Sequence, residues 1–198
     1  MVHNWALNLA NAIGKELNLE NQKLPILSYG LEVLIGAVIR IFIYIAIPYM
    51  LGILDLFWAA FFSMGILKLA SGGVHSNAYY KCLWFSLILL CVIAFMATHL
   101  ATFELPLDEI TITILIITFF TFLKLAPVTV KEKPIRSEKR RIRLKLIACG
   151  LVLVYGASYY LWQPADAVLI ACLLSIAFHD FTLTKAGHQF MRYVDGLI

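Results

Sequence analysis

The stretch that decides the fold is residues 82–103, which reads CLWFSLILLCVIAFMATHLATF. It contains no Asp, Glu, Lys or Arg. A helix that crosses a bilayer needs about 20 mostly apolar residues, because the hydrocarbon core is about 30 Å thick and each residue rises about 1.5 Å. The stretch is long and apolar enough to cross, so it predicts a membrane-spanning helix.

The rest of the chain has the same character. Of its 198 residues, 62% are apolar and 14% are charged, whereas soluble domains average about 45–50% and about 25%. A soluble chain of this length would expose the excess as large apolar patches. We therefore predict an all-α, polytopic membrane helical bundle with about six hydrophobic segments, of which roughly four to six span. The other segments are residues 33–54, 56–70, 110–123, 146–165 and 167–179, of which 56–70 is short enough to be re-entrant.

The distribution of positive charge predicts the orientation in the membrane. Half of the 16 Lys and Arg residues lie in the predicted loop 127–145, whereas the loops near Asp55, 104–109 and 163–166 contain none. Because short cytoplasmic loops are enriched in Lys and Arg, the basic loop is expected inside the cell. Both termini and the connection 68–82 then also face the cytoplasm. The predicted location is the cell membrane, with a lipid bilayer and no nucleic acid as partner.

The N-terminal segment has a different pattern. Trp5, Leu9, Ile13 and Leu17 recur every fourth residue, which is typical of an amphipathic helix, and no cleavable signal peptide is expected. Such a helix either lies flat on the membrane surface or packs on the inner ends of the bundle. We predict one domain, residues 1–198, in which 1–24 form this interfacial segment and 25–198 form the helical bundle.

One cysteine and one histidine have a setting that suits catalysis. Cys82 follows Lys81 at the predicted cytoplasmic start of a span, where a helix N-terminus favours a thiolate. His75 precedes it by seven residues, which on one continuous helix is a rise of about 10.5 Å. Proton transfer needs about 2.6–3.2 Å, so His75 must lie on a turn, for which Gly72 and Gly73 supply the backbone freedom. Candidate residues to orient the imidazole are Ser71, Ser76 and Asn77.

The remaining polar candidates predict less. We expect inert packing from the cysteines inside apolar segments, Cys91, Cys149 and Cys172. His179 and Asp180, at the end of the last span, could pair or relay a proton, but interfacial capping or snorkelling is the favoured interpretation. Arg40 lies inside the first span, where it either lines a substrate path or snorkels. No metal site and no cofactor are expected, because no ligand spacing for a metal appears.

The region from Lys68 to Cys82, KLASGGVHSNAYYKC, resembles the signature of the AgrB (accessory gene regulator protein B) family, roughly R-x-x-x-G-G-x-H-A-x5-C. This sequence differs from the signature at two positions: Lys68 stands in place of the arginine, and Ser76 stands in place of the alanine. Lysine keeps the positive charge of arginine but lacks its planar guanidinium group, which binds a carboxylate through two hydrogen bonds. Further matches are Ala126-Pro127-Val128, Lys133-Pro134-Ile135 and Thr182–Gly187, so the resemblance covers nearly the whole chain.

The resemblance implies a function. AgrB-like proteins are membrane cysteine endopeptidases that process a short pro-peptide, AgrD, in Gram-positive bacteria. By this likeness Cys82 is the nucleophile and His75 the base, while Lys68, Gly72 and Gly73 support the catalytic turn and bind substrate. A thioester on Cys82 would pass to an internal residue of the peptide, giving a cyclic thiolactone or lactone for quorum sensing. A homodimer is left open.

Two other classes of function remain open at this stage. A small membrane transporter or lipid-handling protein without thiol catalysis would use Arg40, Asp180 and the basic loop on a phosphate or carboxylate. A scaffold or sensor would need neither His75 nor Cys82. Signatures of other intramembrane enzymes, His-Glu-x-x-His and Gly-x-Ser-x-Gly, do not occur in the sequence.

Overall fold

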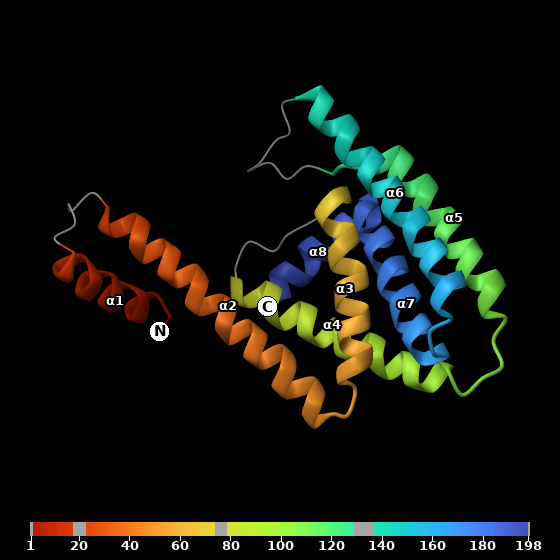
Figure 1. Ribbon diagram of the computed structural model, residues 1–198, viewed down its shortest axis with the longest axis horizontal. Helices are drawn as coiled ribbons and strands as arrows, with labels where there is room; N and C mark the ends of the chain where they lie inside the picture. The colour runs from red at the N-terminus through yellow and green to blue at the C-terminus, as the bar shows by residue number, and fades with distance from the viewer. Residues whose placement is uncertain (1, 18–22, 74–78, 129–136, 198) are drawn as a thin grey trace. The chain divides into compact units, whose positions relative to one another are not determined.

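The computed structural model describes residues 2–17, 23–73, 79–128 and 137–197. Within these ranges the chain forms helices and no strand, which confirms the all-α prediction (Figure 1). Contacts group it into two compact units, Met1–Leu51 and Gly52–Ile198, which are considered separately. The helices are α1 (Val2–Glu16), α2 (Leu24–Met50), α3 (Leu54–Ser71), α4 (Tyr79–Leu100), α5 (Leu107–Leu125), α6 (Glu138–Trp162), α7 (Asp166–Leu183) and α8 (Lys185–Leu197).

The first unit consists of α1 and α2, which pack against each other. The predicted N-terminal amphipathic helix is confirmed as α1. Its buried residues are the small ones, Ala6, Ala10 and Gly14, and a Cβ atom at Gly14 would lie 2.3 Å from Leu24 Cδ2. Within this unit the larger apolar residues Trp5, Leu9 and Leu17 stay exposed. The apolar stripe that predicted an interfacial helix is therefore not buried by the packing of α1 on α2.

Five helices of the described ranges, α2, α3, α4, α6 and α7, are long and apolar enough to cross a membrane. This number agrees with the prediction of a polytopic bundle. The break between the first two predicted segments is also found, because Gly52 adopts φ +70° between α2 and α3. Residues 56–70, for which a re-entrant segment was an alternative, are part of the continuous helix α3.

Helix α5 falls outside this group because of charges at its two ends. Asp108 and Glu109 lie in its first turn and Lys124 in its last. The stretch between them carries no charge, and α5 runs antiparallel to its neighbour α6 (Figure 1). Its apolar middle is thus arranged like those of the longer spans.

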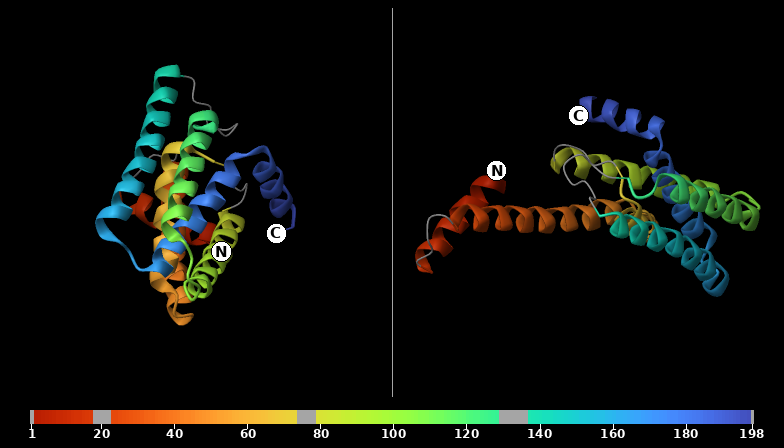
Figure 2. Two further views of the ribbon diagram at one scale, coloured as in Figure 1. Left: turned by 90° about the vertical axis from the view of Figure 1, so that its right-hand side faces the viewer. Right: turned by 90° about the horizontal axis from the view of Figure 1, so that it is seen from above.

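Helix α7 is the centre of the second unit. It has more buried residues than α3, α5 or α6, and α3, α4 and α5 all pack against it (Figure 2). Helix α6 packs in turn on α3 and α5. Helices in lipid associate through close packing rather than through the hydrophobic effect, which favours small residues where they meet. Buried alanines supply them here, namely Ala60, Ala70, Ala94, Ala97, Ala148 and Ala171.

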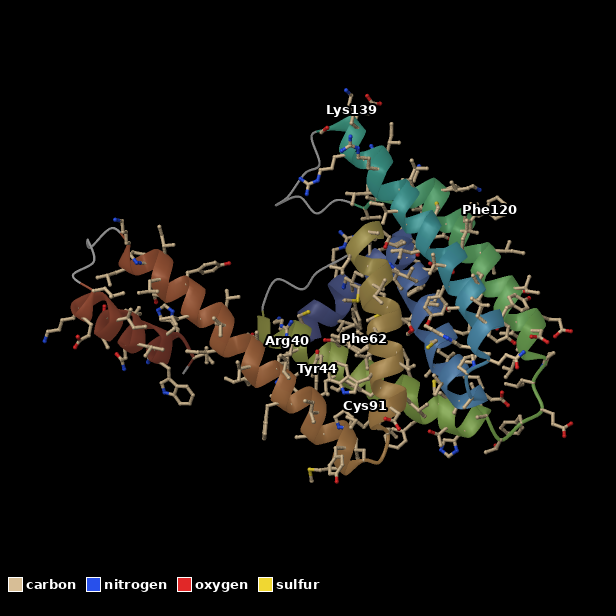
Figure 3. The ribbon with its side chains drawn as sticks, in the orientation of Figure 1. Arg40, Tyr44, Phe62, Cys91, Phe120 and Lys139 are labelled. Atoms are coloured by element: carbon tan, nitrogen blue, oxygen red, sulfur yellow. The ribbon has the colours of Figure 1, made fainter. Side chains whose placement is uncertain are left out.

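The two ends of this unit carry opposite charge. Helix α6 begins at Glu138, whereas the sequence predicts a loop over residues 127–145. The second half of this predicted loop is therefore wrong, because the last five cations of the stretch lie in the first turns of α6. Figure 3 shows Lys139 at this end of α6, and Lys145 Nζ donates a 2.6 Å hydrogen bond to the Leu123 carbonyl of α5. The opposite end holds the acidic first turns of α3, α5 and α7, where carboxylates favour a helix N-terminus.

A sharp junction joins α7 to α8. The Gly187 amide donates a 3.1 Å hydrogen bond to Thr184 Oγ1, which caps the start of α8. A Cβ atom at Gly187 would lie 2.0 Å from the Phe181 carbonyl oxygen, so this position requires glycine. The matched stretch Thr182–Gly187 is therefore a structural junction.

Candidate functional site

The site begins where α3 ends. Gly72 and Gly73 follow Ser71 with φ angles of +76° and +145°, a region that side chains strongly disfavour. The Gly72 amide closes the helix by donating to the Lys68 carbonyl at 3.0 Å. The predicted diglycine turn is therefore confirmed, and it directs the chain away from α3 immediately after Ser71.

A segment distant in sequence holds this turn. The Val128 amide donates a 2.9 Å hydrogen bond to the Ser71 carbonyl, and Gly72 and Val128 form an isolated parallel bridge. A Cβ atom at Gly72 would lie 2.2 Å from the Val128 carbonyl oxygen. The close approach of the two backbones therefore requires glycine at position 72. It also explains why the matched stretch around Val128 belongs to the same site.

Lys68 lies one turn before the diglycine, with its side chain along the turn. A Cβ atom at Gly73 would lie 3.5 Å from Lys68 Cε. The half-buried Lys68 side chain interacts electrostatically with Cys82 of α4 and with His179 of α7. One cation thus lies within electrostatic range of side chains from two other helices.

Cys82 occupies the first turn of α4, as the sequence predicts. The thiol is free and half-buried, and its backbone carbonyl accepts a hydrogen bond from Ser86 Oγ of the next turn. Helix α4 is held against α7 by ring contacts such as Phe85 with Phe178, whose centroids are 6.4 Å apart.

The predicted base, His75, lies outside the described residues, as do Ser76 and Asn77. Of the predicted site residues the structure therefore describes Lys68, Gly72, Gly73 and Cys82. It brings Lys68 together with Gly73 through side-chain contact and with Cys82 through charge. The assignment of His75 as the base stays a prediction.

His179 and Asp180 are not at the surface, so the predicted capping or snorkelling role is wrong. Their side chains are 1% and 7% exposed. His179 Nε2 lies 2.6 Å from Ser71 Oγ of α3, while Asp180 Oδ2 accepts a 2.5 Å hydrogen bond from Thr118 Oγ1 of α5. Two adjacent residues of α7 thus bind two different helices. Sequence alone gave no signal for this, since a polar pair at the end of a span usually reaches toward water.

The other cysteines lie away from this arrangement of charge. Cys149 and Cys172 are buried and Cys91, labelled on α4 in Figure 3, is half-buried. All four cysteines of the chain are free. In the ranges that the structure describes, no three His, Cys, Asp or Glu side chains gather as metal ligands would. Arg40 lies on α2 in the first unit, one turn before Tyr44 (Figure 3), and its role stays a prediction.

These features define a polytopic helical membrane protein with a cysteine, a lysine and a glycine turn at the basic end of its bundle. The model of the family described as AgrB, accessory gene regulator B, matches residues 6–183. The chain therefore belongs to the AgrB family, as its resemblance predicts. This family acts on AgrD-type pro-peptides in quorum sensing, so the protein has a role in processing a signalling peptide at the membrane.

Two relatives from Clostridium perfringens cover almost the full length of the chain. One, of strain SM101, is named "Putative AgrB-like protein" and is 27% identical over 98% of this chain and 97% of its own. Another, of strain 13, is numbered AgrB-like protein 2 and is 28% identical over the same shares. No solved structure matches the chain.

Proposed function

We propose that the protein is a membrane cysteine endopeptidase that cleaves an AgrD-like pro-peptide and releases a cyclic thiolactone or lactone. Cys82 is the nucleophile and His75 the general base. The observation that supports this most is the glycine turn that ends α3 at Ser71, which is held by the 2.9 Å hydrogen bond from the Val128 amide, together with Cys82 in the first turn of the next helix.

The break between α3 and α4 is what a reaction between Cys82 and His75 requires. On a continuous helix the two side chains would be about 10.5 Å apart along the axis. Instead α3 ends at Ser71 and α4 begins at Tyr79, so the two residues do not share a helix.

The reaction follows from these groups. The Cys82 sulfur attacks a peptide carbonyl carbon while His75 takes the thiol proton. The C–N bond then breaks, His75 returns the proton to the leaving amine, and the N-terminal part of the peptide remains on Cys82 as a thioester. An internal thiol or hydroxyl of the peptide next gives its proton to His75 and attacks that carbonyl. The C–S bond to Cys82 breaks, the Cys82 sulfur takes the proton back from His75, and the ring is released. Exchange of one thioester for another roughly conserves bond energy, whereas attack by water would release the peptide as a free acid. The ring therefore forms only if the site excludes water.

Lys68 and the start of α4 supply the electrostatics. Negative charge develops on the carbonyl oxygen as sulfur attacks, and preorganised cations and N–H groups that face it lower the barrier. Lys68 is a cation that interacts electrostatically with Cys82, and the backbone N–H groups in the first turn of a helix have no partner within that helix. Gly73 lies beside the Lys68 side chain, because a Cβ atom at Gly73 would lie 3.5 Å from Lys68 Cε.

The substrate is expected to arrive along the cytoplasmic membrane surface. The basic start of α6 lies at the same end of the bundle as the end of α3 (Figure 1). Positive charge on the cytoplasmic side follows the distribution found in membrane proteins. This end could attract an acidic C-terminal region of the pro-peptide, although most of its charges suit anionic headgroups equally well.

Co-expression with the AgrD-type pro-peptide of the same genome tests the proposal. We expect Cys82→Ala and His75→Ala each to abolish cleavage, as read by the mass of the cell-associated peptide and of the released ring. Cys91→Ala is the matched control, because it removes a half-buried thiol from the same helix. Full cleavage by Cys82→Ala would refute the proposal. Transport or lipid handling without thiol chemistry would instead be unaffected by Cys82→Ser.

A further inference from the structure

The buried His179 is the most unusual side chain of the second unit. It lies at the end of α7, and its imidazole is 1% exposed. Its ring meets residues from two other helices, because Ser71 Oγ of α3 is 2.6 Å from Nε2 and the Phe122 ring of α5 packs edge-on with centroids 6.0 Å apart. A buried polar ring with a specific partner calls for an explanation.

The direction of the hydrogen bond follows from the Ser71 hydroxyl. This hydroxyl has one proton, and the Leu67 carbonyl of its own helix lies 2.8 Å from Oγ in position to accept it. If the proton goes there, Ser71 Oγ must accept from the imidazole. We therefore assign the ring proton to His179 Nε2, which donates to Ser71. Each polar group of the chain Nε2–Oγ–carbonyl is then satisfied.

The bond acts on the residue that starts the catalytic turn. Ser71 is the last residue of α3, and its carbonyl is already held by the Val128 amide at 2.9 Å. His179 holds the same residue through its side chain. A Cβ atom at Gly73 would lie 3.7 Å from His179 Cε1, so the ring also supports the second glycine of the turn. Lys68 interacts electrostatically with the ring, and a Cβ atom at Gly73 would lie 3.5 Å from Lys68 Cε as well.

We propose that His179 is a positioning residue for the peptidase reaction, which by its bond to Ser71 and its place beside Gly73 fixes the glycine turn at the end of α3 that precedes His75. This inference rests on the proposed function. His179 does not exchange a proton with substrate. It acts by holding the backbone at the end of α3 and by fixing the position of the Lys68 side chain.

A purely structural role predicts a different response to substitution. Replacing a buried hydrogen-bonded pair by apolar groups of similar shape is often close to neutral for stability. The double variant Ser71→Ala/His179→Leu should therefore fold and keep its thermal stability. If the bond serves alignment, the same variant should still be poor in catalysis, because misplacement by about 1 Å can cost about 100-fold in rate.

The experiment compares five variants with the wild type in lipid vesicles, with the synthetic AgrD-type pro-peptide of the same genome as substrate. We expect His179→Leu and Ser71→Ala each to lower kcat about 10- to 100-fold with little change in KM. The double variant should be no worse than either single one, because both remove one interaction. His179→Gln, whose amide can donate to Ser71, should recover most of the rate. Ser175→Ala is the control, since it removes a buried hydroxyl that bonds only within α7.

A second measurement needs no pro-peptide. Alkylation of Cys82 by iodoacetamide is followed by peptide mass spectrometry at a series of pH values. If His179 aligns His75 with the thiol, the profile of His179→Leu should move to higher pH, whereas those of Ser175→Ala and wild type should coincide. A merely structural role leaves the profile of every folded variant unchanged.

The outcomes separate the inference from the function on which it rests. Processing by Cys82→Ala would refute the proposed function. If instead wild type needs Cys82 but Ser71→Ala keeps its full kcat and alkylation profile, the positioning role is refuted and the function stands. If His179→Leu fails to fold, kcat and the alkylation profile of His179→Gln and Ser71→Ala decide whether His179 has the positioning role.

Discussion

The Val128 amide donates a 2.9 Å hydrogen bond to the Ser71 carbonyl, and so the segment after α5 holds the end of α3. The bond lies at the residue from which the diglycine turn begins. Two stretches that resemble the AgrB signature, one around Gly72 and one around Val128, are therefore parts of one local structure.

Gly72 should be the least replaceable residue of this structure. In Gly72→Ala the new Cβ atom would lie 2.2 Å from the Val128 carbonyl oxygen at a φ of +76°, and the left-handed conformation alone costs about 1–2 kcal/mol. We expect processing of the pro-peptide to fall at least about 10-fold. Gly65→Ala in α3 is the control, because a Cβ atom there meets nothing within 4 Å. Equal activity of the two variants would contradict the close approach.

The charge of Lys68 should matter more than its shape. Lys68→Met keeps the aliphatic chain but removes the cation that interacts electrostatically with Cys82, so the proposed stabilisation of the oxyanion is lost. We expect kcat to fall about 10- to 100-fold in the vesicle assay. Lys68→Arg, which restores the residue usual in the family, should keep most of the activity. Lys124→Met, at the exposed end of α5, controls for the loss of one positive charge at this end of the bundle.

Substitutions that add or remove a few side-chain atoms at the junction between α7 and α8 should destabilise the protein. Gly187→Ala would place a Cβ atom 2.0 Å from the Phe181 carbonyl oxygen, and Thr184→Ala would remove the cap of α8. Loss of such a cap costs about 1 kcal/mol. We expect both variants to lower the Tm of the purified protein and to speed proteolysis at α8. Gly196→Ala meets nothing within 4 Å and should leave the Tm unchanged; a drop as large as that of Gly187→Ala would rule out the steric explanation.

The orientation in the membrane can be tested with reporter fusions. If α5 crosses together with the five longer helices, both termini lie on the cytoplasmic side with the basic end of the bundle. A fluorescent protein that folds only in the cytoplasm should then be bright at either terminus. Alkaline phosphatase inserted beside Glu104, between α4 and α5, should be active outside. A C-terminal fusion that is dark while the N-terminal one is bright would show that α5 does not cross.

Much of the fold was predictable because its signals are local. The apolar content of residues 82–103 is enough to predict a spanning helix, since twenty residues without charge have few other stable settings. The break at Gly52 and the turn at Gly72 were predictable for a similar reason, because glycine favours conformations that other residues avoid. The start of α6 was misplaced, since Lys and Arg mark a cytoplasmic end but are also good helix formers.

The sequence by itself determined which segments suit the bilayer, which end of each carries charge, and that Cys82 stands at the start of a helix. Only the tertiary structure decided that Ser71, Val128 and His179 meet. The physical reason is that hydropathy depends on neighbours in the chain, whereas these contacts depend on how α3, α4, α5 and α7 pack. Packing of helices in lipid is set by close fit between surfaces far apart in sequence, and no periodicity along the chain records it.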